Sequence, residues 1–374
     1  MGLLDYYRQF AGMSDEEITE QLREQAEEQR RRALARIDVL DLSRTTWHEL
    51  PHPDVVNAVT YAARGALNVA ADPTADELRR ELGRRNGVEP DRVAVGHGAA
   101  QLLASAARAL LAPGDELLTP WPSYGLYPVM AQRAGARAVP VPGGFDAERL
   151  LAAVMPSTRA VALCNPNDPT GEYLTSDALR GLLDALPEHV SLLLDEALAD
   201  FVTVERESVD GAGTGSGTLA LLDEYPRLLI FRTFSKIYGL AGLRVGFAVA
   251  DQAVIDILGR VGRTFHVASP ALVGAQAALD DVDHVAISAR HARVAIERMR
   301  AEIVGPGIRV LPSLANFVLI DCGRPSTPIY DKLLKLGVIV RPMAAWGLPN
   351  HLRVSAASHH DLPRVISALN NVFA

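Results

Sequence analysis

Seven short apolar runs, separated by helical segments, constrain the fold of this chain more than any other feature. Each run has the length of a β-strand, and helix-like sequence follows most of them. Strands that alternate with helices build an open, mostly parallel sheet, because the connecting helices cover both of its faces. We therefore predict an α/β fold with a seven-stranded sheet built from VAVG at 93, ELLTP at 116, RAVPVP at 137, RAVALC at 159, SLLLDEA at 191, LLIFRTF at 228 and VGFAVA at 245.

The pattern differs at both ends of the chain. After about residue 252, helical sequence runs to about residue 303 and leads into IRVLPS, NFVLIDC, VIVRP and LRVSAA, four strand-like runs that indicate a smaller α+β domain. Residues 14–36 predict a highly charged helix with a capping box at its start, either a solvated arm or a helix that embraces a partner subunit. We predict an N-terminal arm (1–45), a large domain (46–251) and a small domain (252–374).

Composition excludes several classes of protein. A net charge of −8 gives no basic patch that would bind nucleic acid. The two cysteines, Cys164 and Cys322, have no spacing typical of a zinc site or a disulfide scaffold, so we expect no metal. No signal peptide and no apolar run near eighteen residues is present, which favours a cytoplasmic protein without a membrane anchor.

The segment TFSKIYGLAGLRVG, residues 233–246, contains the strongest chemical signal. Its lysine, Lys236, follows the apolar run 228–231 and lies near Arg244, so the amine should be poorly hydrated and should lose its proton readily. Such an amine can form a Schiff base with an aldehyde. The alternative is a buried strand followed by a glycine-rich turn and a surface lysine.

The same segment also suits a phosphate group. The hydroxyls of Thr233 and Ser235 and the guanidinium of Arg244 can all donate hydrogen bonds to a dianion. An aldehyde that carries a phosphate is pyridoxal phosphate, and this is the cofactor that the segment predicts.

With this segment the chain resembles the class I/II aminotransferases of the aspartate aminotransferase fold, and most closely their histidinol-phosphate branch, over about residues 45 to 360. The resemblance implies a fold type I enzyme in which Lys236 and Asp195 are catalytic, Asp195 keeping the pyridine nitrogen of pyridoxal 5'-phosphate protonated. Tyr124, in PSYGLY, matches the aromatic residue that stacks on the ring. The cofactor-binding residues that the resemblance implies are Gly98, Ala99, Ala100, Tyr124, Asn165, Asp168, Asp195, Thr233, Ser235, Lys236 and Arg244.

The resemblance also implies a substrate site. Arg353, in LRVSAA, matches the arginine that clamps the substrate α-carboxylate, and Asn316 is a further substrate-binding residue. Arg341, in VIVRP, matches the arginine that binds the substrate phosphate in the histidinol-phosphate branch, although a salt bridge to a surface acid would also explain it. The implied activity is amino transfer between an L-amino acid and a 2-oxo acid in a homodimer, with histidinol phosphate and aromatic amino acids as candidate donors.

Three positions depart from the family pattern. Leu198 and Asp168 stand where the family has a tyrosine and an asparagine that donate to the phenolic oxygen of the cofactor, and Ala70 replaces a tyrosine that reaches the phosphate of the neighbouring subunit. Each lost bond to a charged group is worth about 1.5–3 kcal/mol. These departures leave two alternatives open: a decarboxylase of the same fold, acting for example on an amino-acid phosphate, and a non-catalytic protein that binds pyridoxal phosphate.

Overall fold

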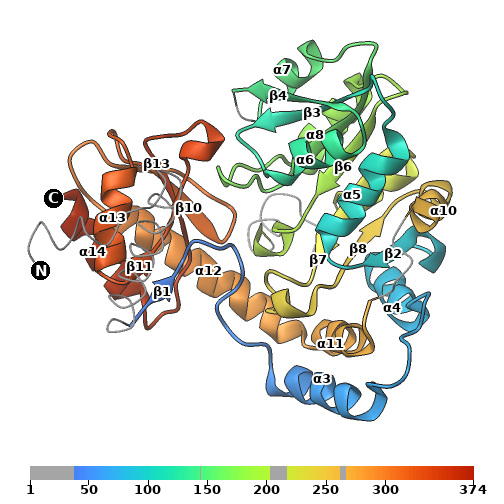
Figure 1. Cartoon of the computed structure of the whole chain (residues 1–374), viewed down its shortest axis with the longest axis horizontal. Coiled ribbons are helices and arrows are strands. Elements are labelled where there is room, and N and C mark those ends of the chain that lie inside the picture. The colour runs from blue at the N-terminus through green and yellow to red at the C-terminus, as the bar shows by residue number, and fades with distance from the viewer. Residues whose placement is uncertain (1–37, 144, 203–216, 262–266) are drawn as a thin grey trace, which may run out of the picture.

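The described residues form a seven-stranded sheet, a four-stranded sheet and a two-stranded pair, and Figure 1 shows the two larger sheets toward the two ends of one long helix. The computed structural model describes residues 38–143, 145–202, 217–261 and 267–374, so the charged helix predicted for residues 14–36 lies outside the described residues. The long helix, α12 (Val282–Glu302), runs from below the large sheet to the small one. The predicted boundaries at residues 45/46 and 251/252 stay a prediction.

The large sheet has seven strands, and each lies at one of the seven predicted apolar runs. The predicted mostly parallel α/β fold is therefore confirmed. Only β8 runs antiparallel to its neighbours β2 and β7. The order across the sheet is β2 (Val93–Gly96), β8 (Gly246–Val249), β7 (Leu228–Thr233), β6 (Ser191–Asp195), β5 (Thr158–Cys164), β3 (Glu116–Trp121) and β4 (Arg137–Pro142).

Both faces of the large sheet are covered by helices, as the continuous apolar strands require. In β6, Leu192 and Leu194 enter the core on one face and Leu193 enters the core on the other. The first face packs against α4 (Asp76–Asn86), α7 (Ala147–Ala152), α8 (Ser176–Ala185) and α11 (Ser269–Asp280). The second packs against α5 (Ala99–Leu110), α6 (Leu126–Arg133) and α10 (Gln252–Val261). Helix α3 (Pro53–Ala66) lies against α11.

The small sheet is antiparallel and has four strands, in the order β12 (Arg341–Pro342), β13 (His351–Ser355), β10 (Phe317–Asp321) and β9 (Arg309–Val310). Its core also includes side chains of α12, α13 (Thr327–Lys335) and α14 (Leu362–Phe373). The run VIVRP, predicted as one strand, is divided: β11 (Val338–Ile339) pairs with β1 (Leu40–Asp41), and only Arg341–Pro342 joins the small sheet. Residues 40 and 41, predicted as part of the arm, thus pair with the C-terminal region.

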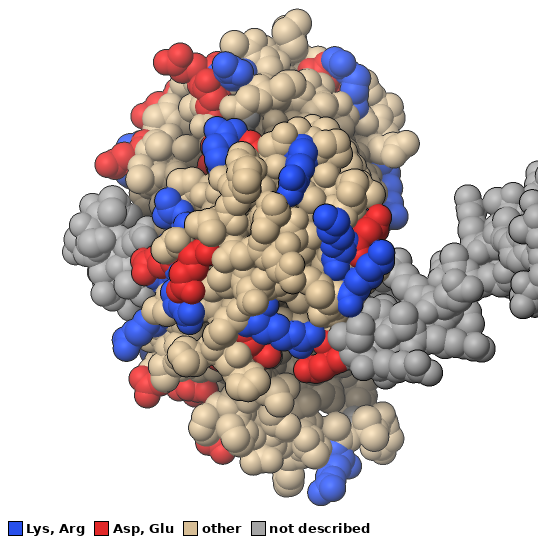
Figure 2. All heavy atoms as spheres, turned by 90° about the vertical axis from the view of Figure 1, so that its left-hand side faces the viewer, with Lys and Arg blue, Asp and Glu red and all other residues tan. Residues whose placement is uncertain are grey.

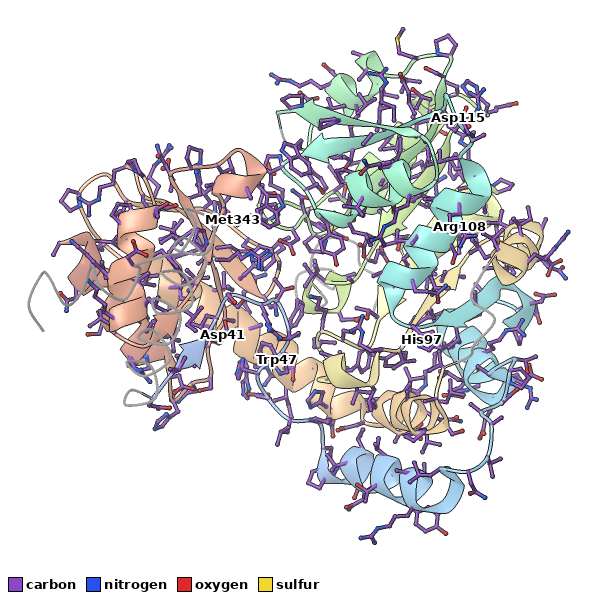
Figure 3. The ribbon with its side chains drawn as sticks, in the orientation of Figure 1. Asp41, Trp47, His97, Arg108, Asp115 and Met343 are labelled. Carbon is purple, nitrogen blue, oxygen red and sulfur yellow. The ribbon has the colours of Figure 1, made fainter. Side chains whose placement is uncertain are left out.

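The small core extends to the large sheet through the segment that follows β1. Trp47 lies in this segment between the two sheets (Figure 3), and its ring centroid is 5.5 Å from that of Phe201. Leu198, Phe201 and Ile237 belong to the same buried cluster as the small-sheet residues Phe317 and Val354. The two sheets therefore share one apolar contact beside the ends of β6 and β7.

Acidic and basic side chains are interspersed on the surface. Figure 2 shows the face on the small-sheet side, where Lys and Arg alternate with Asp and Glu and no single-sign patch forms. Within the described ranges, no helix is long and apolar enough to cross a membrane.

Candidate active site

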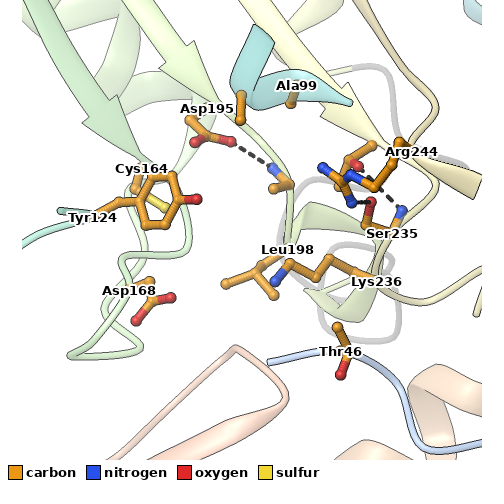
Figure 4. Close-up of a pocket in the computed structure, with 13 residues that line it drawn as sticks. Thr46, Ala99, Tyr124, Cys164, Asp168, Asp195, Leu198, Ser235, Lys236 and Arg244 are labelled. Atoms are coloured by element: carbon orange, nitrogen blue, oxygen red, sulfur yellow. Dashed lines mark hydrogen bonds between the residues drawn. The ribbon is translucent and has the colours of Figure 1, made fainter. Parts of the chain in front are cut away.

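A cavity opens at the carboxyl ends of three neighbouring parallel strands, the place where open α/β sheets bind their ligands. Cys164, Asp195 and Thr233 are the last residues of β5, β6 and β7, and all three line it. The cavity contains about 680 Å³ of empty space, part of it open to solvent. Its lining residues are Thr46, Ala99, Ala100, Tyr124, Cys164, Asp168, Asp195, Ala197, Leu198, Thr233, Ser235, Lys236 and Arg244 (Figure 4).

Lys236 is presented by the tight turn that follows β7. Its amine points into the cavity toward Leu198 (Figure 4) and donates a hydrogen bond to the hydroxyl of Thr45. Burial lowers the pKa of Lys236, as the sequence predicted, and the Arg353 guanidinium lowers it further, against the opposing effect of Asp168. Arg353, which the sequence did not place near the lysine, is the cation among the main causes of this shift.

Asp195 lies at the opposite wall, at the end of β6. Its Oδ2 accepts a hydrogen bond of 3.0 Å from the Tyr127 hydroxyl and its Oδ1 one of 3.1 Å from the Ala197 amide. Burial raises the pKa of Asp195 to about 6, although these two bonds and the Lys236 amine oppose the shift. The buried carboxylate of Asp195 would therefore be stabilised by a positive charge that a ligand places beside it. The next residue along the chain, Glu196, is also buried and forms an ion pair with Arg232 at 2.7 Å.

One end of the cavity has the donors that a phosphate needs. Gly98 caps α5 with a φ of +77°, and no side chain caps this helix, so the first backbone amides are available at the position of Ala99 and Ala100. A Cβ at Gly98 would come within 2.7 Å of the Arg244 guanidinium, which explains the glycine. Arg244 in turn donates to the Ser235 hydroxyl at 3.0 Å (Figure 4).

An aromatic wall faces the lysine. Tyr124 lines the cavity, and its ring meets that of Tyr127 edge-on at 5.7 Å and 82°. Burial, followed by the charges of Asp195 and Asp168, raises the pKa of Tyr124 to about 12, so the phenol is protonated at neutral pH. A flat apolar ligand would therefore contact a neutral ring on this side.

Asp168, which lines the cavity, forms an ion pair with Arg353, which lies behind the lining residues. The carboxylate of Asp168 accepts from Nη1 of Arg353, and Nη2 of the same guanidinium donates to the Ser43 carbonyl at 2.8 Å. The two residues are 185 positions apart in the chain, and the sequence did not indicate that they meet. Arg353, predicted to clamp a substrate carboxylate, is thus bound to a carboxylate of the protein itself.

Asn165, predicted as a cofactor-binding residue, does not line the cavity. Its side chain accepts from the Leu174 amide at 2.8 Å and donates to the Leu174 carbonyl at 2.9 Å. Its amide is thus used to hold the turn that carries Asp168.

Arg341 lies in the small sheet beside Arg353, and Asn316 lies just before strand β10 of the same sheet. Arg341 is directly opposite Arg353 in the β12–β13 register, so both side chains lie on one face of the sheet. Arg341 is exposed and stacks on Trp346 at 5.0 Å, and no ion pair to it occurs among the residues that the structure describes. Asn316 is buried and donates to the Thr45 carbonyl at 3.1 Å.

The departures from the family pattern differ in their surroundings. Leu198 lines the cavity and is buried in the cluster that contains Trp47 and Phe201. Ala70 is exposed on the surface beyond α3.

Sequence reasoning missed several residues of the site. Thr45, Thr46 and Ser43 carry no motif, and they reach the cavity only because β1 pairs with β11. Tyr127 lies in the first turn of α6, and no motif in the sequence indicates that its hydroxyl reaches Asp195.

A phosphate-bearing aromatic ring fits the residues present. Ser235, Arg244 and the uncapped start of α5 suit the phosphate, Tyr124 suits the ring face, and Asp195 suits a protonated ring nitrogen. Leu198, which lines the cavity between the phosphate donors and Asp195, cannot donate a hydrogen bond to an oxygen on the ring.

Comparison with known proteins gives a consistent result. Residues 37–369 match the family model described as aminotransferase class I and II. Histidinol-phosphate aminotransferase 1 of Nitrosococcus oceani is 38% identical over 325 residues, which cover 86% of this chain and 85% of that protein. Histidinol-phosphate aminotransferase 2 of Pseudomonas fluorescens is 40% identical over 300 residues, 79% of each chain.

Solved structures show the same similarity. Histidinol-phosphate aminotransferase from Sinorhizobium meliloti, determined in complex with pyridoxal-5'-phosphate, has a TM-score of 0.82 and 28% identity over 92% of this chain and 94% of that one. Aspartate aminotransferase from Thermus thermophilus with maleate has a TM-score of 0.79 over 95% of this chain and 96% of that one, with 24% identity. The second likeness shows the fold alone.

Proposed function

Because the chain belongs to the class I and II aminotransferases and is a pyridoxal-phosphate-dependent enzyme, we propose that the cavity at the ends of β5, β6 and β7 binds pyridoxal 5'-phosphate and performs amino transfer there. One observation carries this proposal: Asp195, the last residue of β6, and Lys236, in the turn that follows the neighbouring strand β7, both line the same cavity. When bound, pyridoxal phosphate supplies an aldehyde for the substrate amine and a ring that takes up electrons.

The protein's own groups would divide the remaining work. Ser235, Arg244 and the start of α5 hold the phosphate, which fixes the ring in the cavity. Asp195 holds a proton at the ring nitrogen, since a buried carboxylate gains from a neighbouring positive charge. Lys236, whose pKa is lowered by burial, moves the proton at the substrate Cα.

The substrate's anionic group would bind at the end where Arg353, Arg341 and Asn316 lie. We propose that the amino donor carries a phosphate or a second carboxylate there, and the names of the relatives indicate histidinol phosphate. A screen of amino donors against the absorbance of the bound cofactor tests the activity. A ketone or 2-oxo acid product supports amino transfer, whereas an amine with carbon dioxide indicates a decarboxylase and no turnover indicates a binding protein.

The Arg341→Ala variant should raise the KM for a phosphorylated or dicarboxylic donor about 10- to 150-fold, the equivalent of about 1.5–3 kcal/mol for a bond to a charged group. Donors with neutral side chains should change little, because they make no such bond. Steady-state kinetics with both donor types measures the difference. Arg309→Ala, at the opposite edge of the same sheet, is the matched control. Equal losses for both donor types would show that Arg341 has a structural role.

We also propose that two chains associate. Helix α3 and the residues after it expose large apolar side chains, with exposed fractions of 82% for Tyr61, 83% for Leu67 and 61% for Val69. Such residues in one stretch are typical of a surface that another protein covers. Sedimentation equilibrium should give a mass of twice 40.2 kDa, and Tyr61→Glu with Leu67→Glu should give a monomer. A wild-type chain that remains monomeric at micromolar concentration contradicts the proposal.

A further inference from the structure

We infer that Asp168 is a specificity-determining residue: its carboxylate occupies Arg353 and competes there with the carboxylate of a substrate. This inference rests on the proposed role of the cavity in binding amino and oxo acids. It begins with the hydrogen bonds of the arginine. Arg353 is only 7% exposed; Nη1 donates to Asp168 and Nη2 to the Ser43 carbonyl. Its Nε has no partner among the described residues.

An incoming substrate carboxylate meets two partners that already bind the Nη atoms of Arg353. A guanidinium has five N–H groups, and Asp168 and the Ser43 carbonyl each accept from one of them, so a carboxylate that binds across the two Nη atoms must displace one of these partners or share the cation with it. Displacing the Ser43 carbonyl would move the backbone next to Thr45. Displacing Asp168 requires only that one side chain turn away, so Asp168 is the group that an incoming carboxylate replaces.

The turn that carries Asp168 is held firmly, so the carboxylate stays close to the arginine. The neighbouring Asn167 donates to the Pro122 carbonyl at 3.0 Å and to the Thr170 hydroxyl at 2.9 Å, and it accepts from Ser123 at 2.8 Å. On the other side, a Cβ at Gly171 would clash with the Ser313 side chain. A fixed turn raises the local concentration of the carboxylate at Arg353, as any tethered competitor does.

Charge balance gives Asp168 a role in the free protein. Arg341 and Arg353 stand directly opposite on neighbouring antiparallel strands, an arrangement that is destabilising for like charges. The carboxylate of Asp168 offsets one of the two charges. With Asp168 in place, the two arginines retain a net charge of about +1, which balances one anionic group of a substrate. A second anionic group must compete with Asp168 for Arg353. Donors or acceptors that need a carboxylate at Arg353 are thus disfavoured relative to substrates whose anion binds elsewhere.

The binding of maleate to the holoenzyme tests the inference. Maleate has two carboxylates and no amine, so it can bind without reacting. Calorimetry should give a dissociation constant at least about tenfold lower in Asp168→Asn than in the wild type, because a neutral amide competes more weakly for Arg353 than a carboxylate does. Glu172→Gln removes one negative charge from an exposed position of the same turn and should change the constant less than about twofold.

A second variant separates competition from a new contact made by the amide. Asp168→Ala also frees Arg353 and should show a similar gain in maleate affinity. A gain in Asp168→Asn alone would mean that the amide acts elsewhere in the cavity and would overturn the inference. Unchanged or weaker binding in both variants would overturn it too. If the wild type transfers no amino group with any donor, the proposed function fails, and the maleate result still decides whether Asp168 competes for Arg353.

Discussion

Lys236→Ala is expected to lower the rate of amino transfer by at least about 10⁴-fold while the protein stays folded. The substitution removes both the amine that reacts with an aldehyde and the group that moves the proton, and proton transfer by a positioned side chain alone contributes about 10²–10⁴-fold. The amine makes one hydrogen bond, to Thr45, and is not part of the apolar core. Single-turnover kinetics and thermal unfolding measure the two effects separately.

Lys332→Ala is the matched control for this variant. Lys332 is exposed on α13 and lies outside the cavity, so its loss should leave the rate unchanged. A Lys236→Ala protein that turns over at the wild-type rate would contradict the assignment of the lysine. A protein that no longer unfolds cooperatively would show instead that Lys236 is needed for folding.

Asp195→Asn should lower the rate of amino transfer by about 10²–10³-fold, the usual effect of removing one electrostatic contact from a reacting centre. An amide cannot hold a proton on a ring nitrogen as a buried carboxylate does. Asp331→Asn, an exposed position on α13, controls for the change of charge. A rate within about threefold of the wild type would show that Asp195 does not face the reacting ring.

The raised pKa of Asp195 also predicts how binding depends on pH. Its carboxyl is charged above pH 6 and neutral below, because burial raises its pKa to about 6. The attraction for a protonated ring is therefore present above pH 6 and is lost as the pH falls through 6. Pyridoxine 5'-phosphate, which cannot react with Lys236, should bind more weakly below pH 6. The ligand's phosphate also titrates in this pH range and weakens binding in both proteins. The effect of Asp195 is therefore the additional loss of affinity that the wild type shows and Asp195→Asn does not.

The strands and the lysine motif could be predicted from the sequence because their signals are local. Each buried strand is a short apolar run, and the segment around Lys236 contains its phosphate donors within eight residues. The division of VIVRP between two sheets could not be predicted, because it depends on β1, which lies about 300 residues earlier in the chain. Periodicity within one segment does not indicate its partner strand.

The charges around Lys236 show a second limit. Arg244 is close to the lysine in sequence and Arg353 is not, yet Arg353 is the cation that joins burial among the main causes that lower the pKa of Lys236. The meeting of Asp168 with Arg353 has the same cause, because it requires the small sheet to pack beside the ends of β5 and β6. Contacts between distant segments depend on how the sheets pack together, and a local sequence motif contains no information about that packing.

The segment from Ser43 to Thr45 joins the two sheets at the cavity itself. On one side its carbonyls accept from Arg353, Ser355 and Asn316, and on the other its Thr45 hydroxyl accepts from Lys236. A ligand that displaced the Ser43 carbonyl from Arg353 would therefore also shift Thr45, the partner of the lysine. Thermodynamic linkage then requires reciprocity: an anion at Arg353 and a group bound at Lys236 change each other's affinity by the same factor.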